Sequence, residues 1–175
     1  YSQQLVLLLC ASHLGLCELV VRVRCLGILD ETVARNVLDH NGKWFPGIEV
    51  IGAYSFMDCT NLTTIVFSDD IKSIGAYSFS GCFNIKDVNI PNLSVWCGIK
   101  FGSNPLSYAQ NLCVDGKPIY DVVIPDGVTC INKYAFASYK NLKSIKFSDT
   151  VSRIDSVAFY KCINLTSVTI PSSVT

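Results

Sequence analysis

A stretch of twelve residues occurs twice in this chain, almost unchanged, 23 positions apart. The first copy, IGAYSFMDCTNL, begins at Ile51, and the second, IGAYSFSGCFNI, begins at Ile74. A catalytic motif is seldom duplicated at a fixed interval, whereas a unit that stacks on copies of itself has to be. The duplication therefore predicts a repeat architecture, and it constrains the fold more than any other feature of the sequence.

The repeat returns further along the chain, after an interruption. Its phenylalanine slot holds Phe56, Phe79, Phe136 and Phe159, spaced by 23 residues within each pair and by 57 between the pairs. The longer interval is two periods plus eleven residues, so an insertion lies between the second and third units. A period of about 20 to 29 residues with leucine-type positions is typical of leucine-rich repeats.

The slots before the phenylalanine predict a tight corner and a narrow core. An aliphatic residue in each unit is followed by Gly52, Gly75, Asn132 or Asp155. These residue types tolerate a left-handed backbone, so we expect the corner there. A serine or alanine precedes each phenylalanine and leaves room for the ring to lie flat. We therefore expect Phe56 to lie over Phe79 and Phe136 over Phe159.

The slots after the phenylalanine hold cysteine and asparagine. Three of the nine cysteines, Cys59, Cys82 and Cys162, occupy equivalent positions, and Tyr139 replaces the fourth. No CxxC pair is present, which excludes the usual zinc motifs. We interpret the three as buried thiols, with a Cys59–Cys82 disulfide as the alternative. An asparagine follows in every unit, and such a row can satisfy backbone groups of neighbouring coils.

Each unit closes with an alternating segment that predicts a strand: LTTIVF from Leu62, IKDVNI from Ile85, LKSIKF from Leu142 and LTSVTI from Leu165. Their apolar residues face inward. The outward residues of these four segments form one row, which we predict to be the ligand-binding surface: Thr64, Val66, Asp87, Asn89, Ser144, Lys146, Ser167 and Thr169. The alternative is that this row is only a solvated face.

Taken together, these slots resemble the BspA-type leucine-rich repeat. The resemblance implies an α/β solenoid, a right-handed superhelix of mostly short parallel strands with short helical or 3-10 turns. Residues 47–92 and 122–175 each hold two repeats, and the array is read as truncated after the second pair. Residues 93–121 are predicted to form an inserted module with Trp96, Ile99 and Phe101 as an apolar cluster and a hairpin around Asp115-Gly116. Residues 1–46 are left unassigned.

The first 46 residues allow two interpretations. The apolar run from Leu5 to Cys17 resembles a signal-peptide core in length, but a basic stretch before it is absent. Charged residues from Glu18 onward follow too soon for a membrane span of about 20 apolar residues. The segment Val20 to Leu26 alternates like a strand, so the region is either a degraded signal or a cap of the array.

Composition and motifs argue against several functional classes. The formal net charge is zero and no long basic run exists, which argues against nucleic acid as a partner. His13 and His40 are the only histidines, and neither belongs to a recognisable catalytic motif. Acidic pairs such as Asp69-Asp70 are typical of turns and are too sparse for a calcium repeat. The sequence therefore predicts no enzyme activity and no cofactor or metal.

The resemblance also implies a function. Members of the BspA-like group resemble cell-surface or secreted adhesins, so we expect a non-catalytic module that binds an extracellular or host protein, or a glycan, through its strand row. The alternative is a structural spacer within a larger surface protein. An extracellular or cell-surface location is expected, with the cytoplasm as the alternative, and no stable transmembrane span is predicted.

Overall fold

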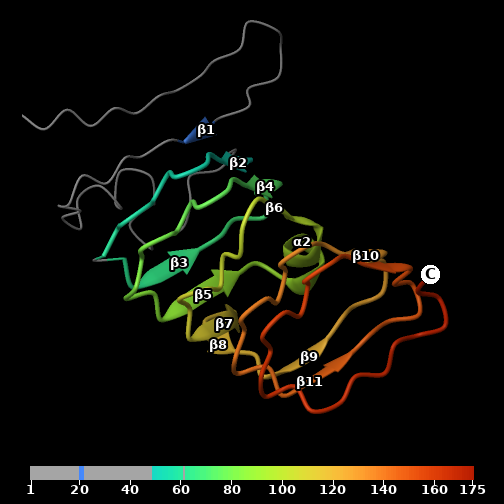
Figure 1. The fold of residues 1–175 in the computed structure, drawn as a ribbon. Coiled ribbons are helices and arrows are strands. Elements are labelled where there is room, and N and C mark those ends of the chain that lie inside the picture. The colour runs from blue at the N-terminus through green and yellow to red at the C-terminus, as the bar shows by residue number, and fades with distance from the viewer. Residues whose placement is uncertain (1–19, 22–48, 61) are drawn as a thin grey trace, which may run out of the picture.

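The chain folds as a solenoid whose coils contribute short strands to two rows (Figure 1). In this computed structural model, residues 20–21, 49–60 and 62–175 are described. One row contains β1 (Val20–Val21), β2 (Val50–Ile51), β4 (Ser73–Ile74) and β6 (Lys100–Phe101), followed by β10 (Cys130–Ile131) and β12 (Arg153–Ile154). The other contains β3 (Thr64–Val66), β5 (Asp87–Ile90), β7 (Asn111–Val114) and β8 (Lys117–Pro118), followed by β9 (Asp121–Val123) and β11 (Ser144–Lys146).

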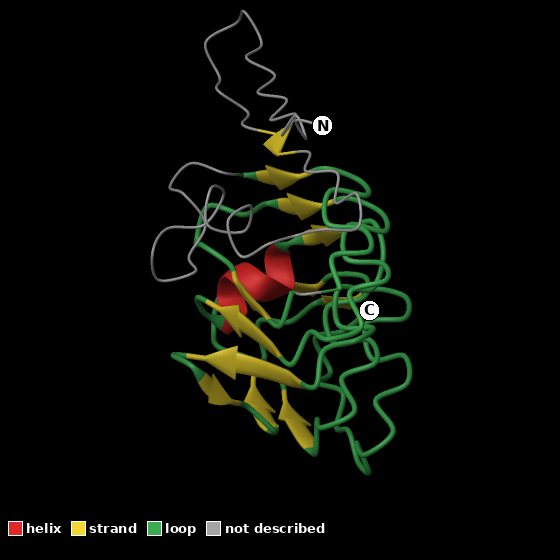
Figure 2. Cartoon of the chain, turned by 90° about the vertical axis from the view of Figure 1, so that its left-hand side faces the viewer, coloured by secondary structure: helices red, strands yellow, loops and turns green. Residues whose placement is uncertain are grey.

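The strands pair mostly in parallel, and their register repeats the sequence period. Val50 pairs with Ser73 and Thr64 with Asp87, each 23 residues further on. Figure 2 shows the strands on one side of the molecule and the turns gathered on the other. The predicted leucine-rich-repeat solenoid of short parallel strands is therefore confirmed. The strand predicted within Val20 to Leu26 is present at β1, which pairs with β2, and the rest of residues 1–46 lies outside the described part.

The phenylalanine slot forms the centre of the stack, as predicted. The ring centroids of Phe56 and Phe79 lie 5.3 Å apart with an interplanar angle of 9°. Those of Phe136 and Phe159 lie 5.3 Å apart with an angle of 2°. A stacked aromatic pair contributes about 0.5–1.5 kcal/mol beyond the area that it buries. The duplicated residues thus fold as consecutive coils whose equivalent side chains touch.

The inward residues of three predicted strands are buried as expected, whereas the fourth strand is absent. Ile65, Val88 and Ile145 each have at most 8% of their surface exposed. The prediction of a strand at Leu165–Ile170 is wrong, because that segment makes no ladder with β11. Two of its apolar residues, Val168 and Ile170, are 41% and 52% exposed.

The left-handed backbone lies two residues away from the predicted corner. None of Gly52, Gly75, Asn132 and Asp155 has a positive φ, so that prediction is wrong. Positive φ values occur instead two residues before each phenylalanine, and two residues after it: Tyr54, Tyr77, Tyr134 and Val157, then Asp58, Gly81, Ser138 and Lys161. The coil as a whole imposes these angles, although an aromatic or β-branched residue disfavours them.

Gly75 is needed for close packing between coils and not for a left-handed backbone. A Cβ atom there would lie 2.4 Å from the backbone nitrogen of Ala53 and 2.7 Å from the carbonyl carbon of Gly52. Gly102, one coil further on, would meet the nitrogen of Ala76 at 2.5 Å. Backbones of successive coils approach so closely at this point that no side chain fits between them. Gly75 and Gly102 are therefore required because of contact between coils, although the equivalent position holds Asn132 and Asp155 in the second pair of repeats.

The cysteine slot links successive coils by hydrogen bonds. Cys82 Sγ donates to the carbonyl oxygen of Phe56 at 2.9 Å, and Cys162 Sγ donates to that of Phe136 at 3.0 Å. Both are free thiols, so the alternative Cys59–Cys82 disulfide is not formed. Cys59 is disulfide-bonded, so its interpretation as a free buried thiol is wrong.

The asparagine slot links the coils in the predicted way. The Nδ2 atoms of Asn84 and Asn164 each donate to a carbonyl oxygen of the preceding coil at 2.7 Å, those of Thr60 and Lys140. Asn141 Nδ2 donates to the carbonyl oxygen of Gln110 at 2.9 Å, so the row continues across the insertion. These bonds satisfy backbone oxygens at a corner where no strand partner exists.

The inserted segment continues both rows of strands. α2 (Leu93–Gly98) is capped by Asn92, whose Oδ1 accepts from the backbone nitrogen of Val95. β6 then pairs with β4, and β7 pairs with β5. Asp115-Gly116, both with positive φ, turn the chain from β7 into the antiparallel β8.

Trp96 joins the two pairs of repeats. Its side chain is fully buried, and its Nε1 donates to the carbonyl oxygen of Ala135 at 2.7 Å. Its ring centroid lies 5.8 Å from that of Phe67 in the first pair and 4.9 Å from that of Phe101. The predicted apolar cluster of the insertion is therefore the connection between the two halves of the core.

Candidate ligand-binding surface

The first half of the predicted row forms one compact patch on β3 and β5. Thr64 lies beside Asp87, and Val66 lies beside Asn89, as register partners of two parallel strands. Their neighbours Ile65 and Val88 point into the core. We call the four outward residues, Thr64, Val66, Asp87 and Asn89, the first patch.

β7 extends the first patch with one residue that the prediction did not name, Asn111. Asn111 lies beside Asp87, and its Nδ2 donates to the Asp87 Oδ1 at 2.8 Å. Cys113 lies beside Asn89 but is only 2% exposed, and burial raises the pKa of its thiol to about 11. β7 is the first strand of the hairpin predicted around Asp115-Gly116, but its pairing with β5 and hence its place beside the first patch were not predicted. Because its side chain is buried, Cys113 adds no exposed group to the first patch.

The second half of the row lies on a separate sheet. Ser144 and Lys146 are on β11, where they are register partners of Asp121 and Val123 on β9. Ser144 Oγ donates to the Asp121 Oδ1 at 2.6 Å, and Val123 is 61% exposed. β9 and β11 form a two-stranded sheet that is distinct from the β3-β5-β7-β8 sheet. We call these four residues the second patch.

Ser167 and Thr169 follow the second patch but are not part of its ladder. Both are exposed, and the segment that carries them makes no strand pairing. Of the eight predicted residues, Val66, Asp87 and Asn89 are half-buried and the other five are exposed. They do not form one continuous row: the structure places them in two patches and on an unpaired terminal coil. Asp121 and Val123 belong to the second patch, although the sequence did not predict them as part of the binding row.

The chemistry of this surface suits contact more than catalysis. It consists of hydroxyl groups, amides, two carboxylates and one ammonium group. Among the described residues, no cluster of three or more histidine, cysteine or acidic side chains is placed to hold a metal ion. Burial raises the pKa of the Cys82 and Cys97 thiols to about 11 and about 12, so both are protonated at neutral pH and are poor nucleophiles. His13 and His40 lie outside the described residues.

The described part of the chain also contains no helix that is long and apolar enough to cross a membrane.

The sequence matches a known repeat family over most of its length. The profile of the BspA type leucine rich repeat region, in 6 copies, matches residues 43–113 and 107–175. The chain belongs to the BspA-type leucine-rich repeat family. The match runs through the insertion as well, in agreement with the continuation of both strand rows by β6 and β7. No curated protein matches the sequence.

Several solved structures of bacterial leucine-rich repeat proteins are similar to this BspA-type chain. A leucine rich cell surface protein of Faecalibacterium prausnitzii is 18% identical with a TM-score of 0.42, over 75% of this chain and 51% of that one. The pneumococcal vaccine antigen PcpA is 17% identical with a TM-score of 0.48, over 73% and 38%. A leucine-rich repeat protein of Bacteroides ovatus is 22% identical with a TM-score of 0.38, over 75% and 37%. This chain thus spans about half or less of the length of these relatives.

Proposed function

We propose that this BspA-type chain is a non-enzymatic binding segment of a cell-surface or secreted protein, and that it recognises an extracellular protein or glycan through its outward strand residues. The observation that carries the proposal is the regular presentation of polar side chains on adjacent parallel strands. Thr64 and Asp87, and Ser144 and Asp121, are held side by side by a rigid ladder. Ordered strands lose little conformational entropy on binding, which favours affinity.

The location follows by analogy. One similar solved structure is described as a cell surface protein and another as a vaccine antigen. Both descriptions are consistent with a surface that meets molecules outside the cell. Fold similarity alone does not assign function, so the argument rests on the site and its test.

The test is capture of soluble extracellular-matrix proteins and glycans on the immobilised chain. The variants Thr64→Glu and Thr169→Glu place a bulky charge on the row, and Ser156→Glu places the same charge on an exposed residue outside it. We expect at least one of the two row variants to weaken capture at least tenfold and the Ser156→Glu control to leave it unchanged. Equal capture by all three variants would contradict the role of the row.

A structural spacer is the second candidate, and the same assay separates the two. A spacer retains nothing specific, at low or at high ionic strength. Retention of a ligand that survives washing and competes with free ligand would therefore exclude a purely structural role for this chain.

A further inference from the structure

Charge is distributed unevenly along the solenoid, although the whole chain is neutral. Residues 49–119 contain six acidic and four basic residues, a net charge of −2, whereas residues 120–175 contain four acidic and six basic residues, a net charge of +2. All six basic residues of that half belong to the second pair of repeats, whereas β9 contributes an acidic residue, Asp121.

Four exposed lysines of that half lie on two successive coils: on the corner before β11, on β11 itself and on the next coil. We call Lys140, Lys143, Lys146 and Lys161 the lysine face. Asn164 Nδ2 donates to the carbonyl oxygen of Lys140, and the backbone nitrogen of Ser138 donates to that of Tyr160. The coil of Lys161 therefore lies directly on the coil of Lys140, at the coil spacing of about 5 Å.

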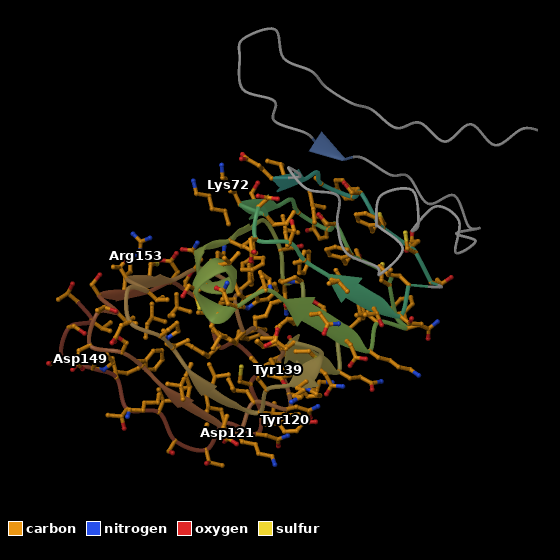
Figure 3. The ribbon with its side chains drawn as sticks, turned by 180° about the vertical axis from the view of Figure 1, so that it is seen from behind. Lys72, Tyr120, Asp121, Tyr139, Asp149 and Arg153 are labelled. Carbon is orange, nitrogen blue, oxygen red and sulfur yellow. The ribbon has the colours of Figure 1, made fainter. Side chains whose placement is uncertain are left out.

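The carboxylates of this half leave the lysine face unneutralised. Asp155 forms an ion pair with Arg153 in the other strand row, with Oδ1 3.0 Å from Nε. Asp126 accepts from Ser148 Oγ in the turn after β9. Asp121 is the one carboxylate in the adjoining second patch, and it already accepts from Ser144 Oγ. In Figure 3 Asp121 and Tyr120 lie together, away from Asp149 and Arg153.

Two tyrosine rings stand beside these lysines. Lys143 Nζ lies 5.3 Å from the ring centroid of Tyr120, and Lys161 Nζ lies 5.2 Å from that of Tyr160. Tyr120 is 37% exposed and Tyr160 is 54% exposed. An exposed ring offers an apolar face to the C–H groups of a sugar, while the ammonium group beside it attracts an anion.

We propose that the lysine face binds an anionic polysaccharide, with sulfate or carboxylate groups on the lysines and sugar rings against Tyr120 and Tyr160. Ser144, Ser167 and Thr169 are exposed in the same half of the chain, and their hydroxyl groups suit sugar hydroxyls. An acidic protein is the less favoured partner, because ammonium groups next to exposed tyrosine rings match the alternation of anionic groups and sugar rings in a polysaccharide. This inference rests on the proposed binding function and names its ligand class.

The experiment measures binding of the 175-residue chain to three immobilised polyanions: a sulfated glycosaminoglycan, its desulfated carboxylate form and polyglutamate. The test variant is K143Q/K146Q/K161Q. The matched control K86Q/K100Q/K117Q removes the same charge from exposed lysines of the first half. Circular dichroism verifies that both variants remain folded.

We expect the wild-type chain to bind at least one of the two glycans more tightly than polyglutamate, and the two glycan arms to identify sulfate or carboxylate as the preferred anion. The test variant should bind at least tenfold more weakly, and the control within twofold of wild type. Binding should also weaken strongly as salt screens the charges.

Three results would overturn the inference: unchanged binding by K143Q/K146Q/K161Q, equal or tighter binding to polyglutamate, or no glycan binding at all. If Thr64→Glu abolishes ligand capture while the lysine variant does not, the proposed binding function stands and the glycan assignment falls. If the chain captures no ligand of any class, both fall.

Discussion

At the scale of single residues, the structure separates two uses of glycine that look the same in a sequence. Glycine is required where φ is positive and also where another backbone approaches too closely for a side chain. The pattern Gly52, Gly75, Asn132 and Asp155 suggested the first use. The structure assigns Gly75 to the second, and it assigns positive φ to Tyr54 and its equivalents.

Gly75→Ala should therefore be strongly destabilising. The new methyl carbon would lie 2.4 Å from the Ala53 nitrogen, so two coils must separate. We expect the free energy of unfolding to fall by about 2 kcal/mol or more, in the range of severe core overpacking. Urea denaturation followed by circular dichroism measures this change.

The matched control is Gly98→Ala, where an added Cβ meets nothing within 4 Å. Because Gly98 ends α2 without a positive φ, this substitution should change stability by less than about 0.5 kcal/mol. Similar losses in both variants would mean that close packing between coils is not the reason for the glycine.

The buried thiols predict a loss of stability in alkaline solution. Burial raises the pKa of Cys82 to about 11 and that of Cys97 to about 12, against an ordinary value of 9.0. Below pH 9 both states keep their protons, and the contribution of the thiols to stability is complete. Above pH 9 the unfolded chain releases protons that the folded chain retains, so each of these thiols should cost about 1 kcal/mol by pH 10.

Urea denaturation under reducing conditions at pH 8, 9 and 10 checks this expectation. The variant Cys97→Ala should show a smaller fall in the free energy of unfolding between pH 8 and pH 10 than the wild-type chain. A fall of the same size in both would show that Cys97 does not contribute to the alkaline effect.

At the scale of elements, α2 and its tryptophan connect the two pairs of repeats. Coils of a solenoid contact only their neighbours, so stability depends on each interface in turn. The connection between the halves includes the Trp96 hydrogen bond to Ala135 and its ring contacts with Phe67 and Phe101.

Trp96→Phe should weaken this connection without unfolding the rest. It removes a buried donor from the Ala135 carbonyl oxygen and leaves a small cavity, which together should cost about 2–3 kcal/mol. Hydrogen exchange should show the largest loss of protection in residues 130–139. A uniform loss along the whole chain would contradict a local connecting role for Trp96.

The repeats could be predicted from the sequence, whereas the insertion could be predicted only in part. Four aligned copies revealed the phenylalanine stack and three of four strands, because each slot was sampled repeatedly. The insertion occurs once, so its apolar cluster and the hairpin around Asp115-Gly116 that β7 and β8 form were visible, but α2 and β6 were not. The predicted binding row omitted Asn111, Asp121 and Val123, and its division into two patches was not predicted.

At the scale of the whole molecule, stacking of equivalent residues accounts for both the stability and the surface of this BspA-type chain. Phenylalanine rings, cysteine thiols and asparagine amides each contact their counterpart coil, and the outward residues are aligned as a consequence. The proposed binding surface and the lysine face both depend on that alignment.

The most direct test of the stack is nuclear Overhauser spectroscopy of the chain with labelled phenylalanine. Rings with centroids 5.3 Å apart place their protons within the range of this effect. The account predicts cross-peaks between the ring protons of Phe56 and Phe79 and between those of Phe136 and Phe159. Absence of both sets in the folded protein would show that the repeats do not stack as consecutive coils.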